Sequence, residues 1–268
     1  FSGLSTNIVE TKTTVFQNYI IQGIVLSFYS FLCIYIGLKN NKYYLHFFSI
    51  LAFINVIFMN DSRTAYIIIF FLFLFLFYKI ITNVKIRLIF FSLVILLVIS
   101  NFSNNFIQRI NALNNDVKLI QNDNFNSSLG MRYVWLNIGL ENLINEPIIG
   151  NGTGSFYKSA ENYFKKNNFT SFGVDANTGR SLNVSSENLI TNNPHSEFIS
   201  ISSQLGILGL LSFSIFLYLL FANNNGPMSF ATFIIVFISS VFNSVFYDNM
   251  IGLFLVILIS LTYKVKLK

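Results

Sequence analysis

The sequence predicts an all-α fold: a polytopic bundle of transmembrane helices with one large, partly helical loop outside the cytoplasm. Of the 268 residues, 53% are hydrophobic and only 10% are charged, whereas soluble domains carry about a quarter charged residues. The apolar residues also gather in segments about as long as a membrane crossing requires. About seven such spans are expected, near residues 17–38, 43–59, 64–82, 87–103, 197–221, 228–247 and 249–264.

Basic residues in the short connections set the expected orientation. If the segments alternate strictly, one side of the membrane receives Lys39, Lys42, Lys79, Lys85, Arg87, Lys264, Lys266 and Lys268. Cytoplasmic connections carry an excess of Lys and Arg, so we expect this side to be the cytoplasm. Arg63, Asp248 and the long segment 104–195 then lie outside. "ANNNGP", a cytoplasmic turn in this scheme, has no charge.

Three regions follow from this arrangement. Residues 1–103 hold about four spans, residues 104–195 form the extracytoplasmic loop, and residues 196–268 hold about three spans. The polar opening, "FSGLSTNIVETKTT", is no signal peptide and lacks Met. We therefore expect the C-terminal portion of a longer protein.

Within the loop, "SLGMRYVWLNIGLENLINEP" has the spacing of an amphipathic helix. Ser127 or Ser128 can cap its start, and Pro147 lies just beyond its expected end. One apolar face is expected to hold Met131, Val134, Trp135, Ile138 and Leu140.

The first candidate for chemistry is "NNPHSEF", at the start of a late apolar segment. Asn192 or Asn193 can cap a helix whose first position suits Pro194. His195 would then lie in the first turn, where the helix dipole disfavours imidazolium and leaves a neutral ring able to act as a general base. Glu197 occupies the same turn, where a carboxylate is favoured. The alternative is a polar interface residue with a capping role.

A second candidate is Arg63, in "NDSRTAYIIIFF". Asp61 or Ser62 can cap the segment that follows, which places Arg63 in its first turn. A cation at this end opposes the helix dipole unless an anion binds there too, and phosphate is the natural anion. The alternative is that Arg63 extends to the lipid headgroups.

Arg132 is a third candidate, three residues before Trp135 on the expected loop helix. Arg132 could contact a phosphate or a sugar, and Trp135 could offer a ring face to carbohydrate. The alternative is a solvated helix face with Trp135 in the core or at the interface. Arg109 and Arg180 are further candidate anion ligands in the loop.

Several classes of site are disfavoured. The eleven acidic residues form no Asp-x-Asp pair and no cluster with His or Cys, so we expect neither a metal site nor a cofactor. "GNGTG" at 150–154 lacks a following Lys and a flanking βα unit, which predicts a tight turn in place of a nucleotide site. The net charge of +6 is scattered, so no nucleic-acid partner is expected.

Taken in order, "SRT" at a span entrance, "GMRYVW", "EPIIGNGTGSF" and "PHSEF" followed by "QLGILGLL" resemble the O-antigen ligase and O-antigen polymerase superfamily over about residues 55–221. The resemblance implies a membrane glycosyltransferase of the GT-C type in the bacterial cytoplasmic (inner) membrane. Its donor would be an oligosaccharide linked to a polyprenyl diphosphate such as undecaprenyl diphosphate. Its acceptor would be a glycan or lipid A core. Membrane lipid would surround the protein.

The resemblance also implies roles for individual residues. Arg63 and Arg132 would hold the lipid diphosphate, and His195 would take the proton of an acceptor hydroxyl, without a metal. The set of candidate substrate contacts is Arg109, Trp135, Arg180, Glu197 and Asp248.

Within the superfamily, the activity could be that of a polymerase, a ligase or a protein O-oligosaccharyltransferase. A flippase or transporter is the rival class, for which ionisable residues inside the spans are expected; here the polar groups gather on one side.

Overall fold

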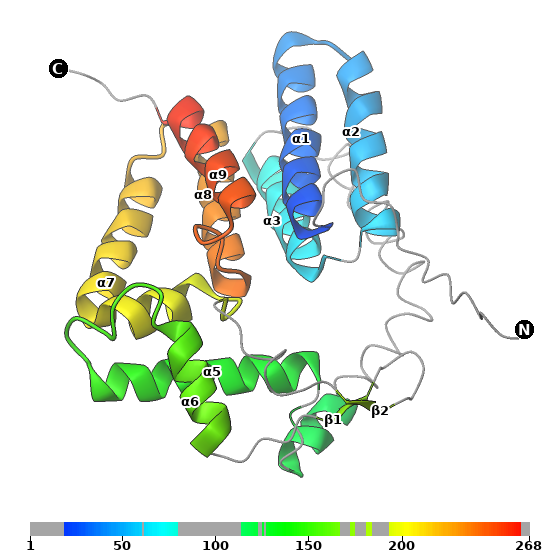
Figure 1. Cartoon of the computed structure of the whole chain (residues 1–268). Coiled ribbons are helices and arrows are strands. Elements are labelled where there is room, and N and C mark those ends of the chain that lie inside the picture. Colours follow the sequence, from blue (N-terminus) through cyan, green and yellow to red (C-terminus); the bar gives the residue numbers. More distant parts are fainter. Residues whose placement is uncertain are drawn as a thin grey trace, which may run out of the picture. The chain divides into compact units, whose positions relative to one another are not determined.

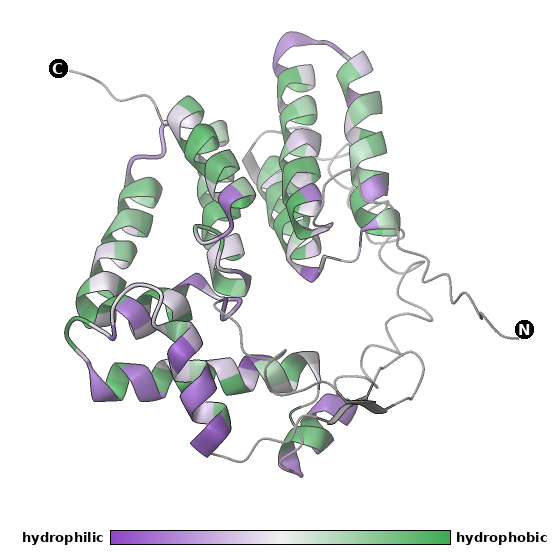
Figure 2. Ribbon diagram, in the orientation of Figure 1, coloured by the Kyte–Doolittle hydropathy of each residue, from purple (hydrophilic) through white to green (hydrophobic). Residues whose placement is uncertain are grey.

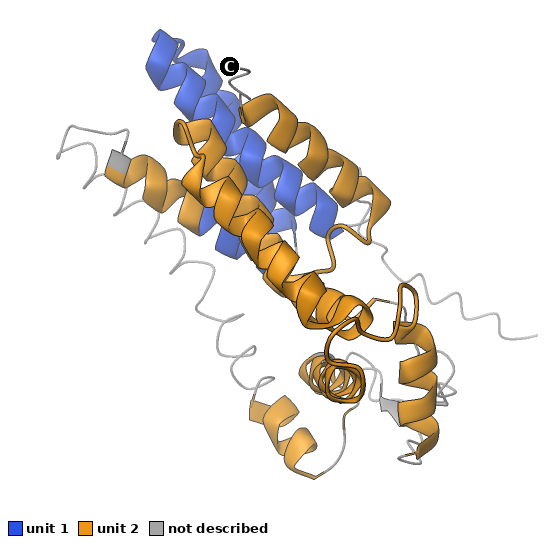
Figure 3. Ribbon diagram, turned by 90° about the vertical axis from the view of Figure 1, so that its left-hand side faces the viewer, with its two compact units in different colours: residues 1–70 blue, residues 71–268 orange. Residues whose placement is uncertain are grey.

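The computed structural model describes residues 19–60, 62–79, 114–122, 125, 127–166, 172–174, 181–183 and 193–263 (Figure 1). The chain divides into two compact units, residues 1–70 (unit 1) and residues 71–268 (unit 2), coloured separately in Figure 3.

Unit 1 is built from apolar helices. They are α1 (Tyr19–Asn40), α2 (Tyr44–Ile54), its π-helical continuation η1 (Asn55–Met59) and the first part of α3 (Arg63–Lys79). α1 and α2 form a helical hairpin (Figure 1). Two buried serines join them: the hydroxyl of Ser30 donates to the backbone carbonyl of Ser49 at 3.0 Å, and the hydroxyl of Ser49 donates to the backbone carbonyl of Ser30 at 2.9 Å. Small hydroxyl residues let apolar helices approach closely and bond across the contact.

Unit 2 combines the rest of α3 with the late apolar helices and the loop helices. Its elements are α5 (Ser128–Asn145), α6 (Phe156–Lys166), β1 (Phe172–Val174), β2 (Ser181–Asn183), α7 (Glu197–Ala222), α8 (Pro227–Phe242) and α9 (Asn249–Thr262). A further helical segment covers residues 114–121. β1 and β2 pair antiparallel. These two three-residue strands are the exception to an otherwise helical description, so the all-α prediction holds apart from them.

The loop has its own small core, between α5 and α6. It consists of Val134, Ile138, Phe156, Ala160 and Phe164, with Met131, Trp135 and Ile199 packed against it. The predicted apolar face of α5 is therefore confirmed at four of its five positions. Leu140 is the error, because its side chain is 47% exposed. Of the two serines predicted as caps, Ser127 is the N-cap of α5, and Pro147 follows the end of the helix by two residues.

Six of the seven predicted spans coincide with helices, and the fourth, 87–103, lies outside the described residues. Figure 2 shows the apolar character of these helices against the more polar α5 and α6. Among the described residues, α1 and α7 are long and apolar enough to cross a membrane, and the other apolar helices have 10–17 residues. A membrane helical protein is consistent with this, and the number seven stays a prediction.

α7 is not the straight span that the sequence predicts. It bends at Gly206, whose backbone angles (φ 63°, ψ −156°) are not helical. Figure 1 shows the two parts of α7 meeting at an angle. The part after the bend, residues 207–222, is about 24 Å long at 1.5 Å per residue.

Candidate functional site

The segment before α7 forms a turn and not the first turn of a helix. His195 has a positive φ of 52°, which a right-handed helix does not accommodate. Its backbone N–H donates to Oδ1 of Asn193 at 2.8 Å, as in an Asx turn. Ser196 is extended, and α7 begins at Glu197. The prediction that Asn193 and Pro194 begin the helix is therefore wrong, and Asn192 lies outside the described residues.

His195 lies against α5. Its ring and that of Trp135 have centroids 4.9 Å apart, with an interplanar angle of 35°. Burial lowers the pKa of His195 below its ordinary value of 6.5, and the positive charge of Arg132 lowers this pKa further. Both effects favour the neutral imidazole that the sequence predicts, through burial and a neighbouring cation and not through the dipole of α7. His195, Trp135 and Arg132 form one group, which we call the His195 cluster.

Close backbone contacts fix α5 in this place. The Ser127 hydroxyl accepts the N–H of Gly130 at 3.0 Å and caps the helix. A Cβ on Gly130 would lie 2.6 Å from the carbonyl oxygen of Phe125, and one on Gly139 would lie 2.6 Å from Cγ2 of Ile199 on α7. Two glycines therefore allow the chain to cross the start of α5 and allow α7 to approach its middle.

The turn after α5 docks on the bend in α7. The N–H of Ile207 donates to the carbonyl of Pro147 at 2.8 Å, and the N–H of Gly152 donates to the carbonyl of Gln204 at 2.9 Å. The bend frees these backbone groups from the helix, and the turn satisfies them, as buried backbone groups require.

Two glycines make this docking possible. Gly150 (φ 68°) and Gly206 (φ 63°) both adopt positive φ. A Cβ on Gly150 would lie 2.4 Å from the carbonyl carbon of Gln204, and one on Gly206 would lie 2.5 Å from the carbonyl oxygen of Ile148. The tight turn predicted for "GNGTG" is confirmed. Sequence reasoning took its partner, "QLGILG", as part of a straight span; the only signal for the bend was a glycine inside a helical pattern.

Two of the predicted substrate contacts, Glu197 and Asp248, accept hydrogen bonds from the backbone at the α8–α9 connection and the start of α9. Glu197 is 5% exposed, and its Oε2 accepts the N–H of Phe246 at 3.1 Å. Asp248 caps α9 by accepting the N–H groups of Met250 at 3.0 Å and Ile251 at 3.3 Å. Both carboxylates thus have structural partners, and contact with substrate stays a prediction for each.

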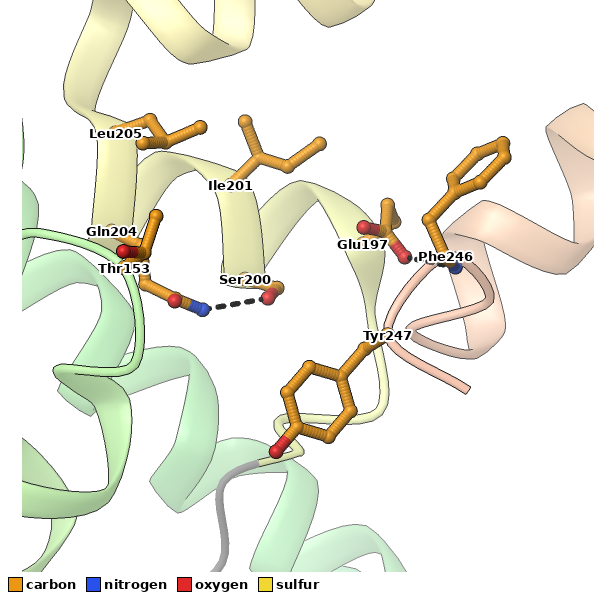
Figure 4. A pocket seen from close by; sticks show the side chains of 8 residues that line it. All are labelled: Thr153, Glu197, Ser200, Ile201, Gln204, Leu205, Phe246 and Tyr247. Carbon is orange, nitrogen blue, oxygen red and sulfur yellow. Dashed lines mark hydrogen bonds between the residues drawn. The ribbon is translucent and has the colours of Figure 1, made fainter. Parts of the chain in front are cut away.

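A pocket of about 180 Å³ lies beside the first part of α7 (Figure 4). Three separate segments contribute its lining: the turn after α5, the first part of α7, and the α8–α9 connection. The lining residues are Thr153, Glu197, Ser200, Ile201, Gln204, Leu205, Phe246 and Tyr247. We call this the α7 pocket. Sequence reasoning found only Glu197 among them.

Arg63 belongs to unit 1, where it is the first residue of α3 and is exposed. The hydroxyl of Ser62 accepts the N–H of Ala65 at 3.3 Å, so Ser62 is the predicted cap; Asp61 lies outside the described residues. Asn60, which the sequence did not single out, holds this entrance. Its Oδ1 accepts the N–H of Ser62 at 2.7 Å, and its Nδ2 donates to the carbonyl of Tyr19 at 2.8 Å.

The remaining candidates are not described. Arg109 and Arg180 lie outside the described residues. In the part of the chain that the structure describes, no three His, Cys, Asp or Glu side chains gather as metal ligands. Metal independence and the absence of a cofactor stay predictions.

Comparison with known proteins agrees with the sequence resemblance. No curated protein matches the chain. The sequence model of the O-antigen ligase family matches residues 47–214, which is more than half of the chain and includes Arg63, Arg132 and His195. Proteins of this family are membrane proteins and glycosyltransferase-like ligases. The chain therefore belongs to the O-antigen ligase family.

Proposed function

We propose that the protein transfers a glycan from a polyprenyl-diphosphate-linked donor to an acceptor hydroxyl at the outer face of the cytoplasmic membrane. The observation that carries this proposal is the His195 cluster. Burial and Arg132 favour the neutral form of His195, which is the form that a general base needs, and the cluster lies within the family match.

In the proposed step, His195 takes the proton of the acceptor hydroxyl while that oxygen attacks the anomeric carbon of the donor sugar. The bond from this carbon to the diphosphate oxygen breaks, and its electron pair leaves with the diphosphate. Arg132, exposed on α5 next to His195, offers a guanidinium to the departing charge, and such preorganised charge is often the largest catalytic contribution. The ring of Trp135 offers an apolar face to a sugar.

Arg63 supplies the second cation in this proposal. Arg63 begins α3, and the N-terminus of a helix is a favourable place for a phosphate. We propose that Arg63 binds a phosphate of the lipid-linked donor.

The acceptor defines the activity further. We propose a polymerase or a ligase of surface polysaccharide; a protein O-oligosaccharyltransferase would share the same donor chemistry. The product separates these activities: a ladder of chain lengths indicates a polymerase, one addition to lipid A core a ligase, and a glycosylated polypeptide protein transfer. Movement of lipid-linked glycan across vesicles without a new glycosidic bond would instead indicate a transporter.

The decisive experiment gives the full-length protein purified lipid-linked oligosaccharide and candidate acceptors in the presence of a chelator. We expect transfer to persist, and His195→Ala to lower the rate by about 10²-fold or more, the low end of general-base effects. His46, the chain's other histidine, provides the matched control, and His46→Gln should keep the rate. Full activity of His195→Ala would remove the general base from the mechanism.

The same assay tests the arginines. Arg63→Lys and Arg132→Lys keep the charge but lose the planar fork that matches phosphate oxygens. We expect both variants to transfer more slowly at saturating acceptor. Strict dependence on a divalent metal would contradict the role given to the two guanidinium groups.

A further inference from the structure

We propose that the α7 pocket is a binding subsite for a single sugar unit of the glycan substrate, next to the sugar that reacts. This inference rests on the proposed function, because it assigns the pocket to the same reaction.

The first argument is the chemistry of the lining. Hydroxyl groups come from Thr153, Ser200 and Tyr247, with a carboxylate from Glu197 and an amide from Gln204. Apolar surface comes from Ile201, Leu205 and the ring of Tyr247. A sugar ring combines hydroxyl groups with an apolar C–H face, and ligand sites pair apolar walls with a few convergent polar groups in this way.

A second argument is size. A volume of about 180 Å³ is below the roughly 300–1,000 Å³ of pockets that enclose drug-sized ligands. The pocket is open to the surface, so its volume suits one sugar ring whose linked neighbours extend beyond it.

The third argument is preorganisation. Oε1 of Gln204 accepts the N–H of Gly154 at 2.6 Å, and its Nε2 donates to the hydroxyl of Ser200 at 2.9 Å. Glu197 is fixed by the N–H of Phe246. The bonds from Gly154 to Gln204 and from Phe246 to Glu197 join the three segments that line the pocket. Figure 4 shows the second of them and the bond between Gln204 and Ser200. No hydrogen bond to the described part of the chain engages the hydroxyls of Thr153 and Tyr247, so both are available to a ligand.

The fourth argument is position. Glu197 follows His195 by two residues, so their Cα atoms are at most about 7 Å apart. The α7 pocket therefore begins within two residues of the general base along the chain, and we place the sugar that it binds next to the reacting sugar. The subsite would align the substrate chain with the general base, which is how binding away from the reacting atoms contributes to rate.

The test uses the full-length protein and two changes from different walls. Tyr247→Ala removes the ring, and Thr153→Trp fills the pocket from its exposed rim. Tyr157→Ala is the matched control, because Tyr157 lies on α6 outside the pocket and is 45% exposed, against 49% for Tyr247. The binding probe is the water-soluble oligosaccharide that mild acid releases from the purified donor. Its binding is measured by calorimetry.

We expect both pocket variants to raise the KM for one substrate, or the Kd of the probe, on the order of tenfold, which is the effect of losing one well-placed contact. kcat should change less, and Tyr157→Ala should behave as the parent. A rise in the KM for acceptor assigns the subsite to the acceptor glycan, and a rise in the KM for donor assigns it to the donor glycan.

Unchanged KM and Kd values in folded variants overturn the inference, as does an equal effect of Tyr157→Ala. If Tyr247→Ala does not fold, Thr153→Trp alone decides, because it removes no packed ring. If the protein transfers no glycan but binds the probe, and the pocket variants lose that binding, the proposed function fails while the sugar subsite stands.

Discussion

Replacing Gly206 with alanine should separate the loop from α7 at their point of contact. Gly206 adopts a φ of 63° and a ψ of −156°, a region that is nearly exclusive to glycine and costs other residues about 1–3 kcal/mol. The new Cβ would also lie 2.5 Å from the carbonyl oxygen of Ile148. Because this neighbour is backbone, the whole turn has to move.

Movement of the turn breaks backbone hydrogen bonds as well. Two of them join the turn to α7 just after the bend, from Ile207 to Pro147 at 2.8 Å and from Leu208 to Ile148 at 3.3 Å. Each contributes about 0.5–1.5 kcal/mol net. Together with the strain, we expect Gly206→Ala to lower the free energy of unfolding by about 4 kcal/mol, which corresponds to a fall in Tm of roughly 8–16 °C for a protein of this size.

Two other glycines isolate the cause. Gly152 also has a positive φ, of 90°, but a Cβ there meets nothing within 4 Å, and neither does a Cβ on Gly226, whose φ is extended. Gly152→Ala should therefore show conformational strain alone, about 1–2 kcal/mol, and Gly226→Ala almost no change. Thermal unfolding followed by circular dichroism measures all three. Equal falls in Tm for Gly206→Ala and Gly152→Ala would refute the close approach of the two backbones.

Three further predictions concern the loop. Burial and Arg132 lower the pKa of His195, so activity should fall only below the ordinary histidine pKa of about 6.5. In a pH–rate profile, Arg132→Gln should shift this acid limb to higher pH, because it removes the positive charge, and Arg132→Lys should not. An unmoved acid limb in Arg132→Gln would contradict the effect of Arg132 on His195. Ser127→Ala removes the cap of α5 and should cost about 1 kcal/mol, whereas Ser127→Thr should not, as thermal unfolding would show. In a background without the native cysteine, a thiol at Lys158 should react with an impermeant reagent from outside and one at Asn223 only from inside; the opposite pattern would reverse the orientation.

The pH argument for His195 also applies to stability. Its pKa in the folded protein is lower than in the unfolded chain, because burial and the Arg132 charge both disfavour imidazolium. Below about pH 6.5 the unfolded chain binds more protons than the folded one. The contribution of the neutral ring to the free energy of unfolding is therefore present above this pH. It is lost as the pH falls toward the pKa of His195 in the folded protein.

Sequence periodicity predicted the helices well, because burial repeats along a helix at a fixed spacing. Val134 and Ile138 are in the loop core as expected, and Ser62 and Ser127 cap the helices that they precede. Leu140 was misplaced, because it follows Ile138 by two residues and so lies about 200° round the helix, on the other face; the buried position is Asn142.

The local path at His195 could not be predicted in the same way. The pattern Asn-Pro-His is compatible with a helix start, and it is also compatible with an Asx turn, in which Asn193 bonds to the backbone two residues later. The approach of Trp135 and Arg132 selects between these paths, and it joins residues 60 positions apart. The α7 pocket was missed for the same reason, because its walls come from three distant segments.

The glycines of this loop belong to the function although none carries chemistry. Gly139 lets α7 approach α5 at Ile199, and Gly150 and Gly206 let the turn lie on the bend. These contacts involve backbone or a single methyl group, so they leave little room for α5 to slide along α7. Since His195 lies two residues before α7 and Trp135 lies one turn before Gly139, the same contacts set the distance between the imidazole and the Arg132 side of α5. A side chain at any of the three positions should therefore disturb the His195 cluster from a distance.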